Sequence, residues 1–150
     1  MAAKAPHLLL VEAPYYTHIA ALLREGAEKA ITAAGATFDI IHVPGSFEIP
    51  GAINMAAKAT GKYDGFVALG CVIRGETTHY DHICESTAHW LQHLAVNDGL
   101  AIGYGILTCE NEQQALHRAN PSGNGRDHGG AAARACLAMV AVRRQFAGQG

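Results

Sequence analysis

The segment from Arg74 to His79 combines residue types that can bind an anion and transfer a proton. Between an apolar run and a helical pattern it carries Gly75, the hydroxyls of a Thr-Thr pair and an imidazole. The start of a helix attracts anions because its first N–H groups lack partners and the helix dipole is positive there. A free imidazole has a pKa of about 6.5, so histidine can exchange a proton near neutral pH. The segment therefore predicts an anion site with a general acid–base beside it.

The same residues also allow a structural interpretation. Thr77 and Thr78 stand where threonine commonly caps a helix, so capping and phosphate binding are equally favoured by the sequence alone. His79 differs from the other histidines only in lying between a strand end and a helix start. Both interpretations stay open for this segment.

Two other segments carry groups suited to a flat, polar ring. Residues 44–50 read PGSFEIP and place Phe47 and Glu48 before a helix, although Glu48 could simply complement the helix dipole. Tyr15, in a Pro-Tyr-Tyr sequence, could stack on a heterocycle, although aromatics there are often core or interface residues. Convergence of these segments would favour a binding site.

The later part of the chain adds two candidates. Tyr104 lies between two glycines, and glycine inside a strand often marks the close approach of a ligand or of backbone. Arg118, in a short helix, could hold a phosphate through paired hydrogen bonds, although a solvated surface arginine is the common alternative. Both are predicted to line a pocket.

The elements that must position these residues follow from apolar runs and helical periodicity. Strands are expected at residues 7–11, 38–43, 65–73 and 101–107, and helices at 19–31, 49–60, 80–97, 111–119 and 130–146. Alternating strands and helices predict one α/β domain over residues 1–150, a three-layer α/β/α sandwich around a four-stranded parallel sheet. Ligands bind beyond the carboxyl ends of such strands. Residues 12–16, 44–48, 73–79 and 108–111 should therefore converge.

Composition excludes several classes of function. The net charge is −2 and only Arg143-Arg144 forms a basic pair, so no surface for nucleic acid is expected. No apolar run approaches the roughly 20 residues that cross a bilayer. The segment Met1–Pro6 lacks the pattern of a secretory signal, which predicts a cytoplasmic protein. The four cysteines form no CxxC pair and are expected to be reduced thiols.

Metal and lysine chemistry are both disfavoured. Glu85, His89 and His93 share a helical face, but metal sites usually need three or four convergent ligands. All four lysines lie outside the strand-end segments, which argues against a Schiff base on the protein. They are Lys4, Lys29, Lys58 and Lys62.

Three ordered motifs resemble the lumazine synthase family. They are GSFEIP at residues 45–50, GCVIRGETTHYD at 70–81 and GILTCENEQQA at 105–115, and the resemblance covers nearly the whole chain. It implies a flavodoxin-like fold and the condensation of 5-amino-6-(D-ribitylamino)uracil with 3,4-dihydroxy-2-butanone 4-phosphate. The products are 6,7-dimethyl-8-ribityllumazine, phosphate and water. The substrate amine supplies the imine, so no cofactor and no metal are implied.

The resemblance also assigns roles to residues. His79 would transfer protons, and the phosphate would be held by Glu76, Thr77 and Arg118. The pyrimidine ring and ribityl chain would contact Tyr15, Ser46, Phe47, Glu48, Cys71, Val72 and Ile73. Tyr104 and Arg118 would come from a neighbouring subunit, which implies a homopentamer with active sites between subunits.

Four positions depart from the family pattern. Pro14 replaces a common arginine, Tyr15 replaces phenylalanine or tryptophan, Glu76 puts an acid near the phosphate, and Gly125-Arg126 stands where lysine is frequent. About five residues precede the first strand, so we expect a free pentamer and not a capsid. A module that binds the ring without turnover and an assembly shell with a vestigial pocket are the alternative functions.

Overall fold

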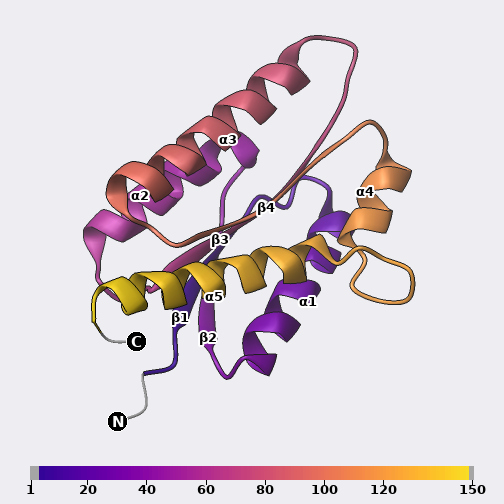
Figure 1. The fold of residues 1–150 in the computed structure, drawn as a ribbon. Helices are drawn as coiled ribbons and strands as arrows, with labels where there is room; N and C mark the ends of the chain where they lie inside the picture. The colour runs from indigo at the N-terminus through magenta and orange to yellow at the C-terminus, as the bar shows by residue number, and fades with distance from the viewer. Residues whose placement is uncertain (1–3, 149–150) are drawn as a thin grey trace.

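Four parallel strands form the sheet at the centre of the molecule (Figure 1). The computed structural model describes residues 4–148, so part of the Met1–Pro6 segment lies outside the described residues. The strands are β1 (His7–Glu12), β2 (Thr37–His42), β3 (Gly65–Ile73) and β4 (Ile102–Cys109), in the order β2-β1-β3-β4. The predicted sheet is confirmed.

Helices cover both faces of this sheet, which confirms the three-layer prediction (Figure 1). One face carries α1 (Thr17–Ala33), α4 (Glu112–Ala119) and α5 (His128–Phe146). The other face carries α2 (Ile49–Ala59) and α3 (His79–Asp98), with the single turn η1 (Ser46–Glu48) before α2. No described helix is long and apolar enough to cross a membrane.

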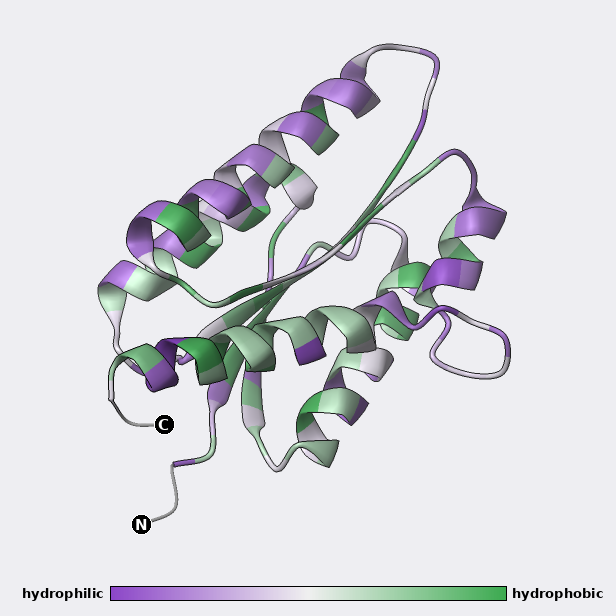
Figure 2. Ribbon diagram, viewed as in Figure 1, coloured by the Kyte–Doolittle hydropathy of each residue, from purple (hydrophilic) through white to green (hydrophobic). Residues whose placement is uncertain are grey.

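Alternation along the strands builds the two cores. In β1, Leu8 and Leu10 pack towards α1 and α5, whereas Leu9 and Val11 pack towards α2. The first six residues of β3 are all buried, as expected for a parallel strand covered on both sides. Apolar residues accordingly concentrate on the strands and on the inner sides of the helices (Figure 2).

Glycines let α5 approach the sheet and α1 very closely. A Cβ on Gly103 would lie 2.0 Å from the carbonyl oxygen of Ala132 in α5, and one on Gly129 would lie 2.0 Å from that of Leu23 in α1. A Cβ on Gly105 would likewise meet the Cβ of Ala132 at 3.1 Å. The close approach of protein backbone is one of the two meanings that the Gly-Tyr-Gly sequence allowed, and it is present at both glycines.

Candidate active site

The loops after the four strands meet at one edge of the sheet, as predicted. The N–H of Val43 donates to the carbonyl of Glu12 and that of Ala13 to Leu69, both at 2.9 Å. The N–H of Arg74 donates to the carbonyl of Cys109, also at 2.9 Å. These bonds join the ends of neighbouring strands, so side chains from four distant segments can line one site.

The turn at residues 45–48 combines a buried anchor with exposed groups. Ser46 is buried, and its Oγ occupies the space beside Gly70, where a Cβ would come within 2.6 Å of it. The N–H of Glu48 closes the turn on the carbonyl of Gly45 at 3.1 Å. Phe47 is 62% exposed and Glu48 is also exposed, so both are available to a ligand.

The last three residues of β3 do not share a face. Val72 packs with the α2/α3 core, on the side of Ser46, whereas Cys71 and Ile73 pack with the α1/α4/α5 core. Only Val72 can present its side chain on the face that carries Ser46. Burial is the main reason why the pKa of Cys71 rises to about 12, with smaller effects from Cys109 and Glu112. The thiol is therefore no nucleophile near neutral pH.

Tyr15 is 74% exposed, more than the other two predicted aromatic residues, Phe47 and Tyr104. Its ring meets that of Tyr16 edge to face, with 4.9 Å between centroids. Tyr16 packs against the α1/α4/α5 core, and burial raises the pKa of its hydroxyl. Tyr16 thus supports the Tyr15 ring, most of which stays exposed.

The segment before α3 is exposed and opens the helix as expected. The Oγ1 of Thr77 accepts a hydrogen bond from the N–H of His79 at 3.2 Å, whereas Thr78 makes no side-chain capping bond. Thr77 therefore satisfies the first N–H of α3 from the position before the N-cap, and the N-cap residue Thr78 does not cap the helix with its side chain. Glu76, both threonines and His79 are exposed, so an incoming anion can reach the helix start.

Arg74, which the sequence did not single out, holds this segment in place. Its Nε donates to both carboxylate oxygens of Glu110, at 2.9 and 3.1 Å, and its Nη1 lies 3.4 Å from Asp81. Its guanidinium stacks on the Tyr80 ring at 4.3 Å. The charge of Arg74 is thus already paired, so this residue supports the loop and does not replace Arg118 as a phosphate ligand.

Arg118, in α4, lies beside the carboxyl end of β4. Its Nη1 donates to the carbonyl of Thr108 at 3.4 Å and to the Sγ of Cys109 at 3.6 Å. Burial, then the charges of Arg118 and Arg126, lower the pKa of His128. Arg118 and Arg126 therefore both lie near His128, which concentrates positive charge at this corner.

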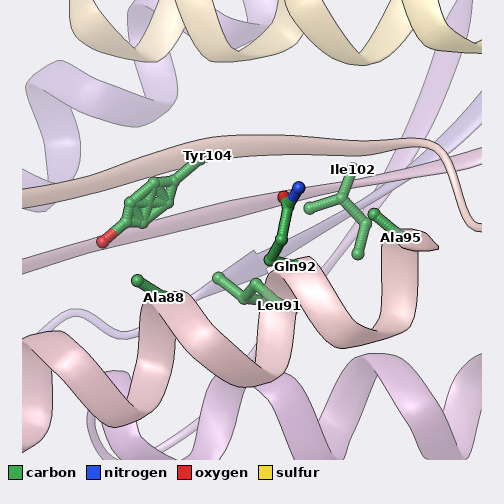
Figure 3. Close-up of a pocket in the computed structure, with 6 residues that line it drawn as sticks. All are labelled: Ala88, Leu91, Gln92, Ala95, Ile102 and Tyr104. Carbon is green, nitrogen blue, oxygen red and sulfur yellow. The ribbon is translucent and has the colours of Figure 1, made fainter. Parts of the chain in front are cut away.

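Tyr104 lies in a groove of about 320 Å³ between α3 and β4, the edge strand of the sheet (Figure 3). Figure 3 shows its ring near Ala88 and its hydroxyl pointing away from Gln92 and Ile102. Within residues 4–148, no hydrogen bond or ion pair joins Tyr104 or Arg118 to the Thr77–His79 segment. One chain therefore makes no direct polar contact, among its described residues, between these two residues and the start of α3.

A second groove, of about 540 Å³, runs between α2 and α3. Phe47 and Trp90 line it, and Trp90 is 50% exposed. Thr87 also lines it, and its buried Oγ1 has no hydrogen-bond partner among the described residues. The sequence did not predict this groove, because Trp90 occupies a position in the helical pattern that is typical of an ordinary surface residue.

The histidines of α3 form no metal centre in the part of the chain that the structure describes. No three His, Cys, Asp or Glu side chains are placed there to hold an ion. The Nδ2 of Asn97 donates to the Nδ1 of His93 at 2.8 Å, and the His93 ring lies beside that of His89. Both histidine rings therefore lie on the surface of α3.

The fold and the loops define an α/β protein of the flavodoxin-like class, with an open site at the carboxyl ends of its parallel strands. The family model of 6,7-dimethyl-8-ribityllumazine synthase matches residues 5–144. The chain belongs to this family.

Curated relatives agree with the family model over nearly full length. The 6,7-dimethyl-8-ribityllumazine synthase of Agrobacterium fabrum is 50% identical over 147 residues, which cover 95% of this chain and 98% of the relative. A protein of Rhizobium meliloti named 6,7-dimethyl-8-ribityllumazine synthase 1 is 48% identical over 147 residues, covering 95% of each chain. The Bartonella tribocorum synthase is 48% identical over 143 residues, covering 95% of this chain and 93% of the relative.

Proposed function

We propose that this protein is a transferase of riboflavin biosynthesis that condenses 5-amino-6-(D-ribitylamino)uracil with 3,4-dihydroxy-2-butanone 4-phosphate. The products are 6,7-dimethyl-8-ribityllumazine, phosphate and water. One observation carries the proposal: a chain 50% identical to a lumazine synthase brings its strand-end motifs to one edge of the sheet. The alternatives, a binding module and a vestigial shell, have no such specific support.

The pyrimidine substrate fits the loops after β1, β2 and β3. The open face of Tyr15 stacks on the ring, and Phe47, Glu48 and the anchored Ser46 turn contact the ring and its ribityl chain. Val72 contributes its side chain, whereas Cys71 and Ile73, which point to the other core, contribute backbone groups. A planar heterocycle with a polyol chain suits this mixture of aromatic and polar groups.

The phosphate of the second substrate is held at the start of α3. Thr77 and the free N–H groups of the helix bind its oxygens, and Arg118 supplies the positive charge. Glu76 takes part through its backbone N–H, with its exposed carboxylate directed to solvent. Phosphate leaves as an anion from a position where the helix dipole stabilises it.

His79 moves protons as the amine of the pyrimidine adds to the ketone carbonyl and water leaves to form the imine. Its position as the first residue of α3 places the imidazole beside the phosphate site. The imine nitrogen comes from the substrate, so the protein needs no lysine, cofactor or metal for this step. Two of the lysines are engaged in surface ion pairs, Lys29 with Glu25 and Lys62 with Asp39.

The complete site lies between two subunits of a cytoplasmic homopentamer. Tyr104 and Arg118 of one subunit complete the site that contains His79 of the next. Support comes from the open α2/α3 face and from the partly exposed Tyr104 ring at its edge. Small molecules and copies of this chain are therefore the partners that we propose.

An assay with both purified substrates and a metal chelator tests the proposal. We expect the absorbance and fluorescence of a lumazine to appear without any added metal or nucleotide. His79→Ala should lower kcat by about 10²–10⁴-fold, the usual contribution of a general acid–base. His82→Ala, which removes another exposed histidine of α3, is the matched control and should retain activity. No product from the wild type would refute the function, and equal kinetics for His79→Ala would refute the role of His79.

A further inference from the structure

Glu12, the last residue of β1, is the one buried carboxylate in the part of the chain that the structure describes. It is 1% exposed and stands at the edge of the sheet where the site loops begin. A buried charge is costly unless it is paired and hydrogen-bonded. The residue roles described above do not explain why the chain has a charged residue at this position.

Two basic side chains from different elements meet this carboxylate. Arg24 of α1 donates through Nη1 to both oxygens, at 2.9 and 3.0 Å. His42, the last residue of β2, brings its Nε2 to 3.4 Å. Glu12 thus joins the ends of two strands to the helix that covers them.

Both loops of the pyrimidine half of the site start at this junction. Residues 13–16, with Tyr15, follow Glu12 directly, and residues 43–48, with the Ser46 turn, follow His42. The backbones also join there, because the N–H of Val43 donates to the carbonyl of Glu12 at 2.9 Å. The relative position of the two loops therefore depends on the Glu12 junction.

We propose that Glu12 is a positioning residue that, through Arg24 and His42, holds the loops at residues 13–16 and 43–48 in register to receive the pyrimidine substrate. The name of that ligand rests on the proposed function. Glu12 cannot contact the ligand itself, since its side chain is buried against α1. The phosphate half has separate support from the Arg74–Glu110 pair, so Glu12 acts on one substrate and not on the other.

Glu12→Gln removes the charge and keeps the shape. We expect the KM for the pyrimidine to rise about tenfold, in line with the loss of a hydrogen bond to a charged group. The kcat at saturation and the KM for the phosphate substrate should stay within about twofold, since neither depends on these loops. Arg24→Gln should have a similar effect, and the double variant should resemble either single one because both break the same bridge.

The matched control is Glu25→Gln, which removes the exposed carboxylate that pairs with Lys29 on the same helix. It should leave all kinetic constants unchanged. A KM for the pyrimidine that is unchanged in folded Glu12→Gln, or an equal change for both substrates, would overturn the proposal. If Glu12→Gln does not fold, the partly exposed partners Arg24 and His42 give variants, Arg24→Gln and His42→Gln, on which the same comparison decides.

Amide hydrogen exchange separates this proposal from the proposed function, because it needs no turnover. In Glu12→Gln, exchange should quicken at residues 13–16 and 43–48 and stay unchanged at residues 74–79. Unchanged exchange in the first two loops would overturn the positioning role even if the wild type proves active. An inactive wild type whose loops loosen as expected would refute the function and leave the role of Glu12 in the loops supported.

Discussion

The two faces of the sheet are built in different ways. On the α1/α4/α5 face, Gly103 and Gly129 allow backbone to pack on backbone with no space for a Cβ. On the α2/α3 face, grooves of about 320 and 540 Å³ remain open. Trp90 and Tyr104 are 50% and 43% exposed there, and Thr87 has no hydrogen-bond partner for its buried hydroxyl.

This difference indicates which face the chain completes by itself. The close α5 packing is finished within one subunit, whereas open apolar grooves on a folded protein mark places where another molecule binds. Tyr104 and Phe47 lie on or beside the open face. In our account, a second copy covers this face and completes the active site at the same time.

Overpacking the closed face should have the largest effect. Gly103→Val places a side chain where the Ala132 carbonyl oxygen already lies, and we expect a loss of about 3 kcal/mol or more in the free energy of unfolding. Gly61→Ala in the exposed turn after α2, where nothing lies within 4 Å of the added methyl group, is the control and should stabilise by about 0.4–1 kcal/mol. Urea denaturation measures both, and equal stability of the two variants would contradict the comparison.

A charge on the open face should break assembly and spare the fold. For Trp90→Glu we expect an intact far-ultraviolet circular dichroism spectrum, a smaller native mass and little activity. Buried tryptophans at interfaces commonly contribute about 2–4 kcal/mol to association. Native mass spectrometry measures the assembly, with Glu25→Gln on the closed side as the control. An unchanged mass would show that this face is not the interface.

Removing the support of the phosphate loop should have a moderate effect. Arg74→Ala breaks the contacts with Glu110, Asp81 and Tyr80, so the segment before α3 loses its fixed position. We expect kcat/KM for the phosphate substrate to fall about tenfold, the effect of losing one well-placed charged contact. Steady-state kinetics at saturating pyrimidine measures this change. A fall confined to the KM of the pyrimidine would assign Arg74 to the other half of the site.

A change in acid stability is the smallest effect that we predict. Hydrogen bonds from Lys62, Tyr63 and His7 hold the pKa of Asp39 well below its usual range. Such a carboxylate stabilises the fold above its unfolded pKa of about 4, and this contribution is lost as the pH falls through the lower folded value. The Tm difference between wild type and Asp39→Asn should therefore shrink below pH 4. A difference that grows in acid would contradict the assignment.

The periodic parts of the structure could be predicted from the sequence, and the paired charges could not. The predicted strand 65–73 has the observed bounds to the residue, because an apolar run bounded by glycine has few other ways to fold. The shared binding role of Cys71, Val72 and Ile73 stays a prediction, but their side chains cannot share a face, since alternation along a strand sends neighbours to opposite sides. The Arg74–Glu110 pair joins residues 36 positions apart, which no local pattern reveals.

Complementation between two inactive variants tests the central claim most directly. His79→Ala and Arg118→Ala, carrying different tags, are co-expressed and the mixed assemblies are purified through both tags. If each site takes His79 from one subunit and Arg118 from its neighbour, random mixing leaves about one site in four intact, and about a quarter of the wild-type activity should return. Mixed assemblies as inactive as either parent would contradict a site shared between subunits.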